Sequence, residues 1–427
     1  KQWVDCDCTP HKLPYIFRMR LFSLLPLVIF AHSLLAENWP GWRGPRGDGT
    51  SLEKNVPTEW SATKNIAWKT LVPGKSHASP IVWEDRVFVV TCIKEEQERR
   101  LLCIDRIQGI VLWQKLVVKS PLERVHRLNS RASSTPATDG KLVYVSFLDV
   151  KAIVVAAFDF QGNLKWQVRP GVFSSVHGYC SSPVIWNDKL IVNGDHDGPS
   201  YIVGLERKTG KTLWKTKRPN RTRSYCVPTI YHLSNRNQMI LSGDKSVASY
   251  DPDTGKNIWY LNGPTDQFVA SIVHNKDANL LFMTGGFPAH HIMGLRHDGN
   301  GVINDQKKIQ WHHRTPNWVS YVPSPISEGK YFLILNDRGF ASCFDAKSGK
   351  NTWAGEKLGR GAHASLVSAE GLVYFTFDDG TTRLIRAGKA LDIVTENSIG
   401  EGVFASPAIS QGQIFIKGNH HLFCIGK

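Results

Sequence analysis

Side chains that could bind an anion recur at one place in the sequence pattern, a few residues before short apolar segments. Imidazole, guanidinium and phenol groups bind carboxylate, phosphate or sulfate through charge-assisted hydrogen bonds. The pattern predicts a ligand-binding set at the mouth of a channel; the alternative is a solvated rim in which each side chain bonds its own backbone. The members of the set are His77, Arg131, His177, Tyr179, Arg223, Tyr225, Tyr321, Arg360, His363, Glu401 and Phe404.

The segments that carry these residues are basic. Together they hold 16 lysines or arginines and five acids, in a chain whose formal net charge is +15. Such a charge favours anionic partners and surfaces. The acidic stretch 193–200 offsets part of it. The segments span residues 69–79, 114–135, 167–182, 215–227, 260–271, 312–324, 354–365 and 395–406.

Signals for catalysis are weak, and the sequence identifies no catalytic residue. There is no Ser-His-Asp arrangement, no phosphate-binding glycine loop and no metal-binding cysteine spacing. Only Asp266 and Glu401 supply carboxylates near the mouth. The adjacent histidine pairs at 290, 312 and 420 point to opposite faces if they lie on strands, so we expect no metal site. His290 and His291 keep a rim role if they lie on a loop.

A nine-residue motif shows which elements must position these groups. "DPDTGKNIW" at 251–259 has near-copies at 206–214 and 345–353. Each copy follows an apolar strand and precedes another, so it predicts the last hairpin of a four-stranded antiparallel meander. Asp251 can accept hydrogen bonds from the turn, and Gly255 supplies the positive φ that closes it.

The repeat period predicts a closed ring. First strands are marked by Pro80, Pro136, Pro183, Pro228, Ile272, Pro325, Leu366 and Pro407, which lie 41 to 56 residues apart. Last strands contain Trp68, Trp113, Trp166, Trp214, Trp259, Trp311, Trp353 and Val394. The strand of Trp68 precedes every first strand, and the final repeat stops after its third. The N-terminal strand can therefore complete the last sheet, which predicts an all-β, eight-bladed β-propeller. The seven tryptophans are expected to pack between blades rather than on a ligand.

The N-terminal region has the pattern of an export signal. Met19 and Arg20 precede an apolar run that ends before Ala36, and the run is short for a membrane span. We expect residues 1–18 to be upstream sequence, 19–36 a signal peptide, 37–60 an extension and 61–427 the propeller. The alternative for 19–36 is a retained anchor. No cysteine follows the run, so a lipoprotein is not expected, and Cys180 and Cys226 are the one pair to test for a disulfide.

These features resemble the pyrroloquinoline-quinone (PQQ) repeat propellers. The family's tryptophan-docking motif, Ala-x-Asp-x-x-Thr-Gly-Lys-x-x-Trp, matches closely at 249–259 and 343–353 and more loosely at 103–113, 157–166 and 204–214. The segment "NWPGWRGPRGDGTS" at 38–51 resembles the opening of secreted members from environmental bacteria, and it could pack across the propeller. The resemblance implies either a quinoprotein dehydrogenase that binds PQQ and calcium, or a cofactor-free protein-binding propeller of the BamB type.

Departures from both types lead to two hypotheses. The sequence lacks the adjacent cysteines and long insertions of the dehydrogenases, and the lipid-attachment cysteine of the BamB type. The first hypothesis is an exported, periplasmic or extracellular propeller without a cofactor. It would bind a protein, anionic glycan or small molecule as a monomer, with no nucleic acid partner and no stable membrane insertion. The second is a PQQ-dependent oxidoreductase with calcium, using Asp266, Glu401, His177 and Arg131.

Overall fold

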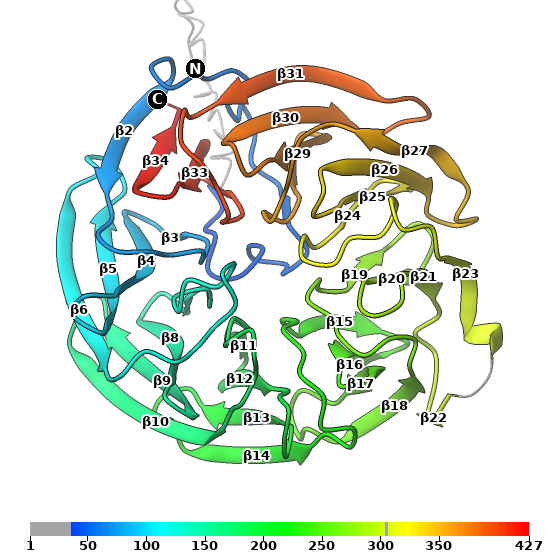
Figure 1. Ribbon diagram of the computed structural model, residues 1–427, viewed down its shortest axis with the longest axis horizontal. Helices are drawn as coiled ribbons and strands as arrows, with labels where there is room; N and C mark the ends of the chain where they lie inside the picture. The colour runs from blue at the N-terminus through cyan, green and yellow to red at the C-terminus, as the bar shows by residue number, and fades with distance from the viewer. Residues whose placement is uncertain (1–35, 304–305, 427) are drawn as a thin grey trace, which may run out of the picture. The chain divides into compact units, whose positions relative to one another are not determined.

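The computed structural model describes residues 36–303 and 306–426. In these residues, eight antiparallel sheets of four strands follow one another around a ring (Figure 1). This confirms the eight-bladed β-propeller predicted from the repeat. Residues 1–18 and 19–35, with Cys6, Cys8 and Met19, lie outside the described residues. Within the described ranges, no helix has the length and apolar character needed to cross a membrane.

The first four blades follow the chain order. Blade 1 contains β3 (Ile81–Trp83), β4 (Arg86–Ile93), β5 (Glu98–Asp105) and β6 (Val111–Lys119). Blade 2 contains β7 (Ala137–Thr138), β8 (Leu142–Asp149), β9 (Ala152–Asp159) and β10 (Leu164–Val172). Blade 3 contains β11 (Val184–Trp186), β12 (Lys189–Gly194), β13 (Tyr201–Glu206) and β14 (Thr212–Lys217). Blade 4 contains β15 (Thr229–Leu233), β16 (Arg236–Gly243), β17 (Ser246–Tyr250) and β18 (Asn257–Asn262).

The other four blades complete the circle. Blade 5 contains β19 (Val273–Asn275), β20 (Leu280–Gly285), β21 (His291–Leu295) and β23 (Ile309–His313). Blade 6 contains β24 (Ile326–Glu328), β25 (Tyr331–Leu335), β26 (Phe340–Asp345) and β27 (Asn351–Lys357). Blade 7 contains β28 (Val367–Ala369), β29 (Leu372–Thr376), β30 (Thr381–Arg386) and β31 (Asp392–Ser398). Blade 8 contains β32 (Ala408–Ser410), β33 (Gln413–Lys417), β34 (His421–Ile425) and β2 (Ile66–Leu71). A 3-10 turn, η1 (Gln306–Lys308), precedes β23, and β22 (Gly301–Val302) pairs in parallel with β18.

Each first strand begins at the residue after its marker. Pro80 precedes β3 and Pro136 precedes β7, and the same offset holds in all eight blades, including those marked by Ile272 and Leu366. Proline fixes φ and forces the preceding residue into an extended conformation. Each linking segment therefore arrives extended at the centre of the ring and starts its strand there.

The ring is closed by the N-terminal strand. β2 pairs antiparallel with β34, with Trp68 opposite Cys424 and Leu71 opposite His421. Apolar residues between neighbouring sheets form the core, and Trp68 packs on the cluster that holds Phe415 and Phe423. The closure removes the free edge that an open row of sheets would leave.

Repeated tryptophans such as Trp68 and Trp166 lie between one blade and the turn of the next. The Trp68 Nε1 donates to the Arg106 carbonyl at 2.8 Å, and the Trp166 Nε1 donates to the Arg207 carbonyl at 3.0 Å. In the opening motif, Asp251 accepts from the backbone of Asp253 and Thr254 at 2.8 and 3.1 Å. A Cβ on Gly255, which has a φ of 70°, would lie 2.4 Å from the Trp214 ring. The glycine thus provides both the turn conformation and a flat surface for the indole.

The segment 37–51 runs across the middle of the ring as a strap (Figure 1). Trp39 forms a bridge with Val82 of blade 1, and β1 (Thr50–Ser51) pairs in parallel with β28 of blade 7. Between these ends, the Arg43 Nη2 donates to the Pro325 carbonyl at 2.6 Å. Trp39 and Arg43 are fully buried. The strap therefore closes one end of the central channel.

Candidate functional site

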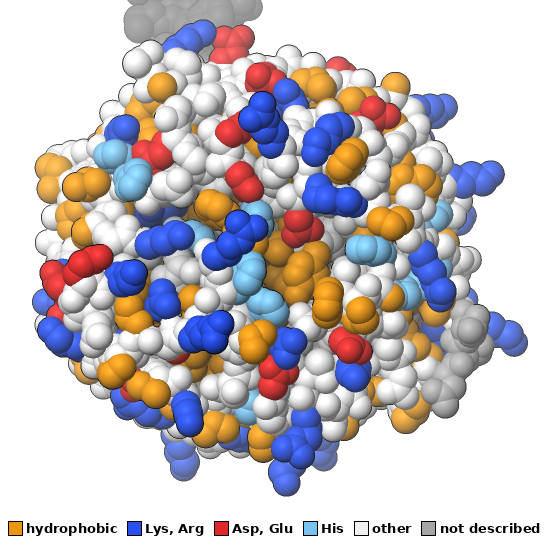
Figure 2. All heavy atoms as spheres, in the orientation of Figure 1, with side chains coloured by type: hydrophobic (Ala, Val, Ile, Leu, Met, Phe, Trp, Pro, Cys, Tyr) orange, Lys and Arg blue, Asp and Glu red, His pale blue; other side chains and the backbone are white. Residues whose placement is uncertain are grey.

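A cavity of about 810 Å³ lies on the ring axis, within the described part of the chain. Figure 2 shows a hollow near the middle of this face, lined with hydrophobic and histidine side chains, with lysine and arginine side chains around it. Every blade contributes through the segment before its first strand. In blade order, the lining includes His77, Ser133, His177, Tyr225, Ser271, Tyr321, His363 and Phe404.

A belt of hydroxyl groups holds these segments together. The residue before each marker is a serine or threonine in seven blades, and in six of them its amide donates to the corresponding hydroxyl of the next blade. The Ser406 amide donates to Ser79 Oγ at 3.0 Å, and the Ser79 amide to Thr135 Oγ1 at 3.0 Å. The pattern continues from Thr135 to Ser182 and from Ser271 through Ser324 and Ser365 to Ser406. Val227 of blade 4 interrupts it. The belt fixes the inner wall against which the cavity side chains are oriented.

The strap supplies the floor of the cavity. Trp42 lines it, and the Trp42 Nε1 lies 3.4 Å from Ser271 Oγ, at a residue of the belt. With Trp39 anchored at blade 1 and Arg43 at blade 6, this indole is held across the channel. The cavity is consequently blind on the strap side.

His77 presents an imidazole nitrogen that has no partner. Its Nδ1 lies 2.9 Å from the Leu128 carbonyl, and the acceptor there requires that Nδ1 carry the proton. Its Nε2 is buried without a hydrogen bond to any described residue. Burial lowers the pKa of His77 to about 4, so at neutral pH the ring is uncharged and Nε2 is an acceptor. His363 is oriented in a similar way, because its Nδ1 lies 2.9 Å from an Asp378 oxygen.

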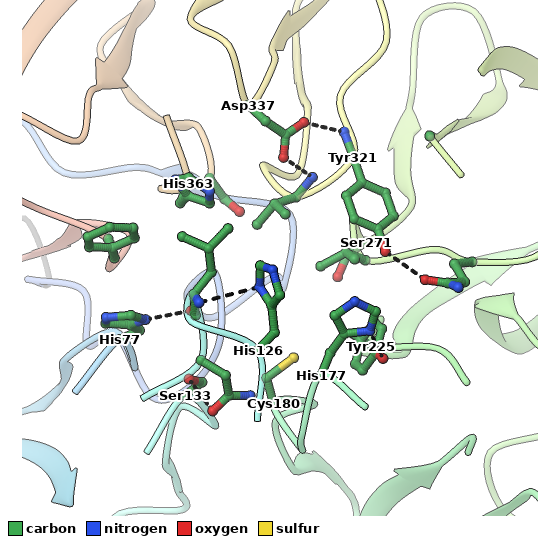
Figure 3. A pocket seen from close by; sticks show the side chains of 18 of the residues that line it. His77, His126, Ser133, His177, Cys180, Tyr225, Ser271, Tyr321, Asp337 and His363 are labelled. Atoms are coloured by element: carbon green, nitrogen blue, oxygen red, sulfur yellow. Dashed lines mark hydrogen bonds between the residues drawn. The ribbon is translucent and has the colours of Figure 1, made fainter. Parts of the chain in front are cut away.

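His177 and Tyr225 form a second polar group on the opposite wall (Figure 3). The Tyr225 hydroxyl lies 2.8 Å from His177 Nδ1 and 2.6 Å from Ser175 Oγ. Burial lowers the pKa of His177 and raises the pKa of Tyr225. His126 meets His177 edge-on, with ring centroids 5.4 Å apart. His177 and Tyr225 are therefore neutral hydrogen-bonding groups near pH 7.

Arg223 provides a positive charge to the lining. Its Nη1 donates to Asp197 at 2.6 Å. When the Gln267 amide nitrogen donates to the Tyr321 hydroxyl at 3.0 Å, the Gln267 oxygen accepts from Arg223 Nη2 and Nε at 3.0 and 3.2 Å. Arg223, Gln267 and Tyr321 thus form one network, which spans the walls of three blades.

Of the described residues that line the cavity, Asp337 alone carries a carboxylate. Its two oxygens accept from the amides of Tyr321 and Val322 at 2.8 and 2.9 Å (Figure 3). Burial raises the pKa of Asp337 despite these bonds. The carboxylate is used to hold its own linking segment.

The lining does not fit PQQ with a metal ion. The family's dehydrogenases place a disulfide of adjacent cysteines over the quinone, whereas Cys180 lies in the lining between Tyr179 and Ser181 and is a free thiol. Calcium requires several oxygen ligands, and the one lining carboxylate is already bonded to two amides. Among the described residues, no group of three or more histidines, cysteines or acids is placed to hold a metal.

Seven of the eleven predicted residues line the cavity, and four do not. Tyr179 is buried in its blade, with its hydroxyl 3.2 Å from Ser146 Oγ. Arg131 lines a smaller neighbouring pocket, Arg360 is exposed outside the lining, and Glu401 accepts from the amide and Nδ1 of His421 at 2.9 and 2.7 Å. The seven in the lining are His77, His177, Arg223, Tyr225, Tyr321, His363 and Phe404.

The set suggested for acid-base and calcium chemistry is not brought together. Of its four residues only His177 lines the cavity, while Asp266 forms an ion pair with Lys245 at 3.4 Å. His291 begins β21, so the loop expected there is shorter than the sequence suggested. The His291 Nδ1 lies 2.8 Å from His312 Nε2 on the neighbouring strand β23. This contact joins the histidine pair at 290–291 to the pair at 312–313.

The sequence did not indicate His126, Gln267, Asp337 or Trp42 as lining residues. Asp337 belongs to the loop after a second strand, and Trp42 to the strap. A consistent signal does exist for the aspartates. In blades 4, 6 and 7 an aspartate lies one or two residues after the end of the second strand. It accepts a hydrogen bond from the linking segment of the same blade. These aspartates are Asp244, Asp337 and Asp378.

Comparison with known proteins gives one family and two kinds of relative. Residues 53–194 and 131–280 match the family model described as outer membrane protein assembly factor BamB. The chain is 21% identical over 278 residues to outer membrane protein assembly factor BamB of Moranella endobia (strain PCIT), covering 64% of this chain and 63% of that protein. It is 25% identical over 205 residues to the lanthanide-dependent methanol dehydrogenase of Methylacidiphilum fumariolicum (strain SolV), covering 45% and 31%. The chain thus spans less than two thirds of either relative.

Solved structures share the fold. BamB from Moraxella catarrhalis aligns with a TM-score of 0.60 and 11% identity, covering 84% of this chain and 99% of that one. The quinohemoprotein alcohol dehydrogenase from Comamonas testosteroni aligns with a TM-score of 0.64 and 13% identity, covering 91% and 81%. At such identities the likeness concerns the arrangement of the blades, and the function has to be argued from the site.

Proposed function

Because this chain belongs to the family described as outer membrane protein assembly factor BamB, we propose that it is an exported, non-catalytic binding propeller. Its ligand is a segment of a protein, an anionic glycan or an anionic small molecule, recognised on the face where the central cavity opens. The proposal rests on one observation above all. All eight blades line one central cavity that offers hydrogen-bonding side chains, while the described residues include no group of three or more histidines, cysteines or acids that could hold a metal ion.

The lining favours a ligand with an apolar body and a few polar groups. Phe404, Val269 and Trp42 offer apolar surface, and pockets of this size bury most of a small ligand. Arg223 favours a negative group at the same opening.

Titration of the tryptophan fluorescence tests the proposal. Candidate ligands are acidic peptides that carry one aromatic residue and anionic oligosaccharides. Trp42 lines the cavity, so the change that is lost in Trp42→Phe reports on binding there. We expect saturable binding that weakens about tenfold in Arg223→Gln, since one charge-assisted hydrogen bond contributes about 1.5–3 kcal/mol. The matched control is Arg314→Gln, outside the lining. Binding that ignores Arg223 and leaves the Trp42 signal unchanged would contradict a ligand in the cavity.

The second candidate function is a PQQ-dependent oxidoreductase, which the methanol dehydrogenase relative favours. The same titration with PQQ, with and without calcium or a lanthanide, separates the two. Metal-dependent saturable quenching together with turnover of an alcohol would overturn the non-catalytic proposal. Absence of PQQ binding would leave the docking motifs with a structural role.

A further inference from the structure

A second pocket opens beside the central cavity, between blades 1 and 2. It has a volume of about 310 Å³ and is formed by Lys75, the end of β4 and the linking segment 125–131. His126 and Asn129 line both pockets, so the two spaces adjoin. The four cationic side chains that line the smaller one are Lys75, Lys94, Arg127 and Arg131.

These cations are poorly compensated. Lys75, Lys94 and Arg127 make no side-chain hydrogen bond or ion pair with any described residue, and the Arg131 Nε donates to the Glu123 carbonyl at 3.0 Å. The Glu123 carboxylate is already paired with the fully buried Arg99 at 2.5 Å. Glu95 follows Lys94 in an exposed turn and does not line the pocket. The pocket therefore holds an excess of positive charge.

Blade 1 differs here from the blades that carry acids. In blades 6 and 7 an aspartate after the second strand faces the linking segment of its own blade and bonds it. In blade 1 the residue after β4 is Lys94, which lines the pocket together with Lys75. Clustered cations raise the positive potential at a concave site, and this potential attracts an anion. Where other blades place an acid that holds their own linking segment, blade 1 thus places cations at a pocket.

We propose that this pocket is a subsite for a tetrahedral oxyanion, a phosphate or sulfate ester, whose organic part occupies the central cavity. This rests on the proposed function, because it assigns the anionic group of the cavity ligand to a place. Two lysines and two arginines supply more hydrogen-bond donors than one carboxylate accepts, and they suit the three terminal oxygens of a phosphate or sulfate ester. The guanidinium groups of Arg127 and Arg131 can each donate two bonds to neighbouring oxygens of one anion.

Calorimetric titration with inorganic phosphate and sulfate, then phenyl phosphate and phenyl sulfate, tests the proposal at low ionic strength. The double variant Lys94→Gln/Arg127→Gln changes exposed residues without described partners, so we expect an unchanged thermal transition. We expect at least tenfold weaker binding of both ions in it. The control, Lys256→Gln/Lys347→Gln, makes the same charge change at exposed turns and should bind as the original protein does.

The esters test the link to the central cavity. The phenyl esters should bind at least tenfold more tightly than the free ions, and they should quench Trp42. Phenyl phosphate gains its second charge near pH 6, so its affinity should rise from about pH 5 to 8 while that of phenyl sulfate stays constant. Tighter binding of phenyl phosphate at pH 8 would identify a phosphate ester as the ligand, and tighter binding of phenyl sulfate would identify a sulfate ester.

Three results would overturn the subsite. They are absence of saturable binding of either ion, equal loss in both double variants, and esters that bind no better than free ions. If the peptides or oligosaccharides still quench Trp42 in those cases, the proposed function stands and only the subsite fails. If Trp42 reports no ligand while the ions bind at the pocket, the proposed function fails instead.

Discussion

His77 and Phe404 stack face to face, with ring centroids 4.5 Å apart and 14° between the ring planes. The first side chain comes from blade 1 and the second from blade 8, so the contact joins the cavity wall where the ring is closed. His363 meets the same phenyl ring at 5.1 Å. Phe404 thus separates two imidazoles, each of which has its Nδ1 held by a protein acceptor.

The stability of the fold should depend on pH through His77. Its folded pKa of about 4 lies below the ordinary value of 6.5, so below pH 6.5 the unfolded chain binds a proton that the folded one does not. The free energy of unfolding should therefore fall between about pH 6.5 and pH 4, by up to about 3 kcal/mol from this residue. Urea unfolding at several pH values measures it. His77→Phe should flatten the slope, whereas His420→Phe at an exposed position should not. An unchanged slope in His77→Phe would contradict the assignment.

The turn glycines should divide by what they face. Gly255 and Gly412 both have a φ of 70°, but a Cβ on Gly255 meets Trp214 while one on Gly412 meets nothing within 4 Å. We expect Gly412→Ala to cost about 1 kcal/mol for the backbone alone. Gly255→Ala should cost about 1–3 kcal/mol more because the indole has to move. Chemical denaturation compares them, and equal costs would show that the indole contact contributes nothing.

The hydroxyl belt should contribute to stability at each link. Ser324→Ala removes the acceptor of the Ser271 amide, a bond of 2.9 Å in a buried position. A buried donor without a partner costs about 1–3 kcal/mol. Ser348→Ala removes a bond to Asp345 at an exposed turn, where water replaces it, and should change stability by less than about 0.5 kcal/mol. Similar costs for the two variants would be evidence against the belt.

Cys180 and Cys226 should remain thiols and react slowly. Both are free, and burial raises the pKa of each to about 12, so little thiolate forms at pH 8. Intact mass after treatment with iodoacetamide should show neither residue modified in the native protein and both modified in urea. Loss of two hydrogen masses in the untreated protein would instead indicate a disulfide.

The sequence could predict those parts of the molecule that repeat. Pro183 and Pro228 mark a period, and a period fixes both the strand starts and the residues just before them, so His177 and Tyr225 could be placed at the cavity. The sequence could not place Glu401. This residue stands at a similar distance before its marker Pro407, but its carboxylate accepts from the amides of His420 and His421. The sequence could not find Trp42 either, because that residue belongs to no repeat and reaches the cavity only through the strap.

Pairing of β2 with β34 has a consequence for how the protein reaches its native state. Trp68 and Cys424 are opposite each other although more than three hundred residues separate them along the chain. Local hairpins can form one by one as the chain emerges, but this contact joins strands near the two ends of the described chain and carries the loop-closure entropy of a long loop. β2 therefore stays unpaired until the other strands of blade 8 have formed. We expect a late, slow step in refolding that Trp68 fluorescence follows, with the exposed early strand as the place where aggregation begins.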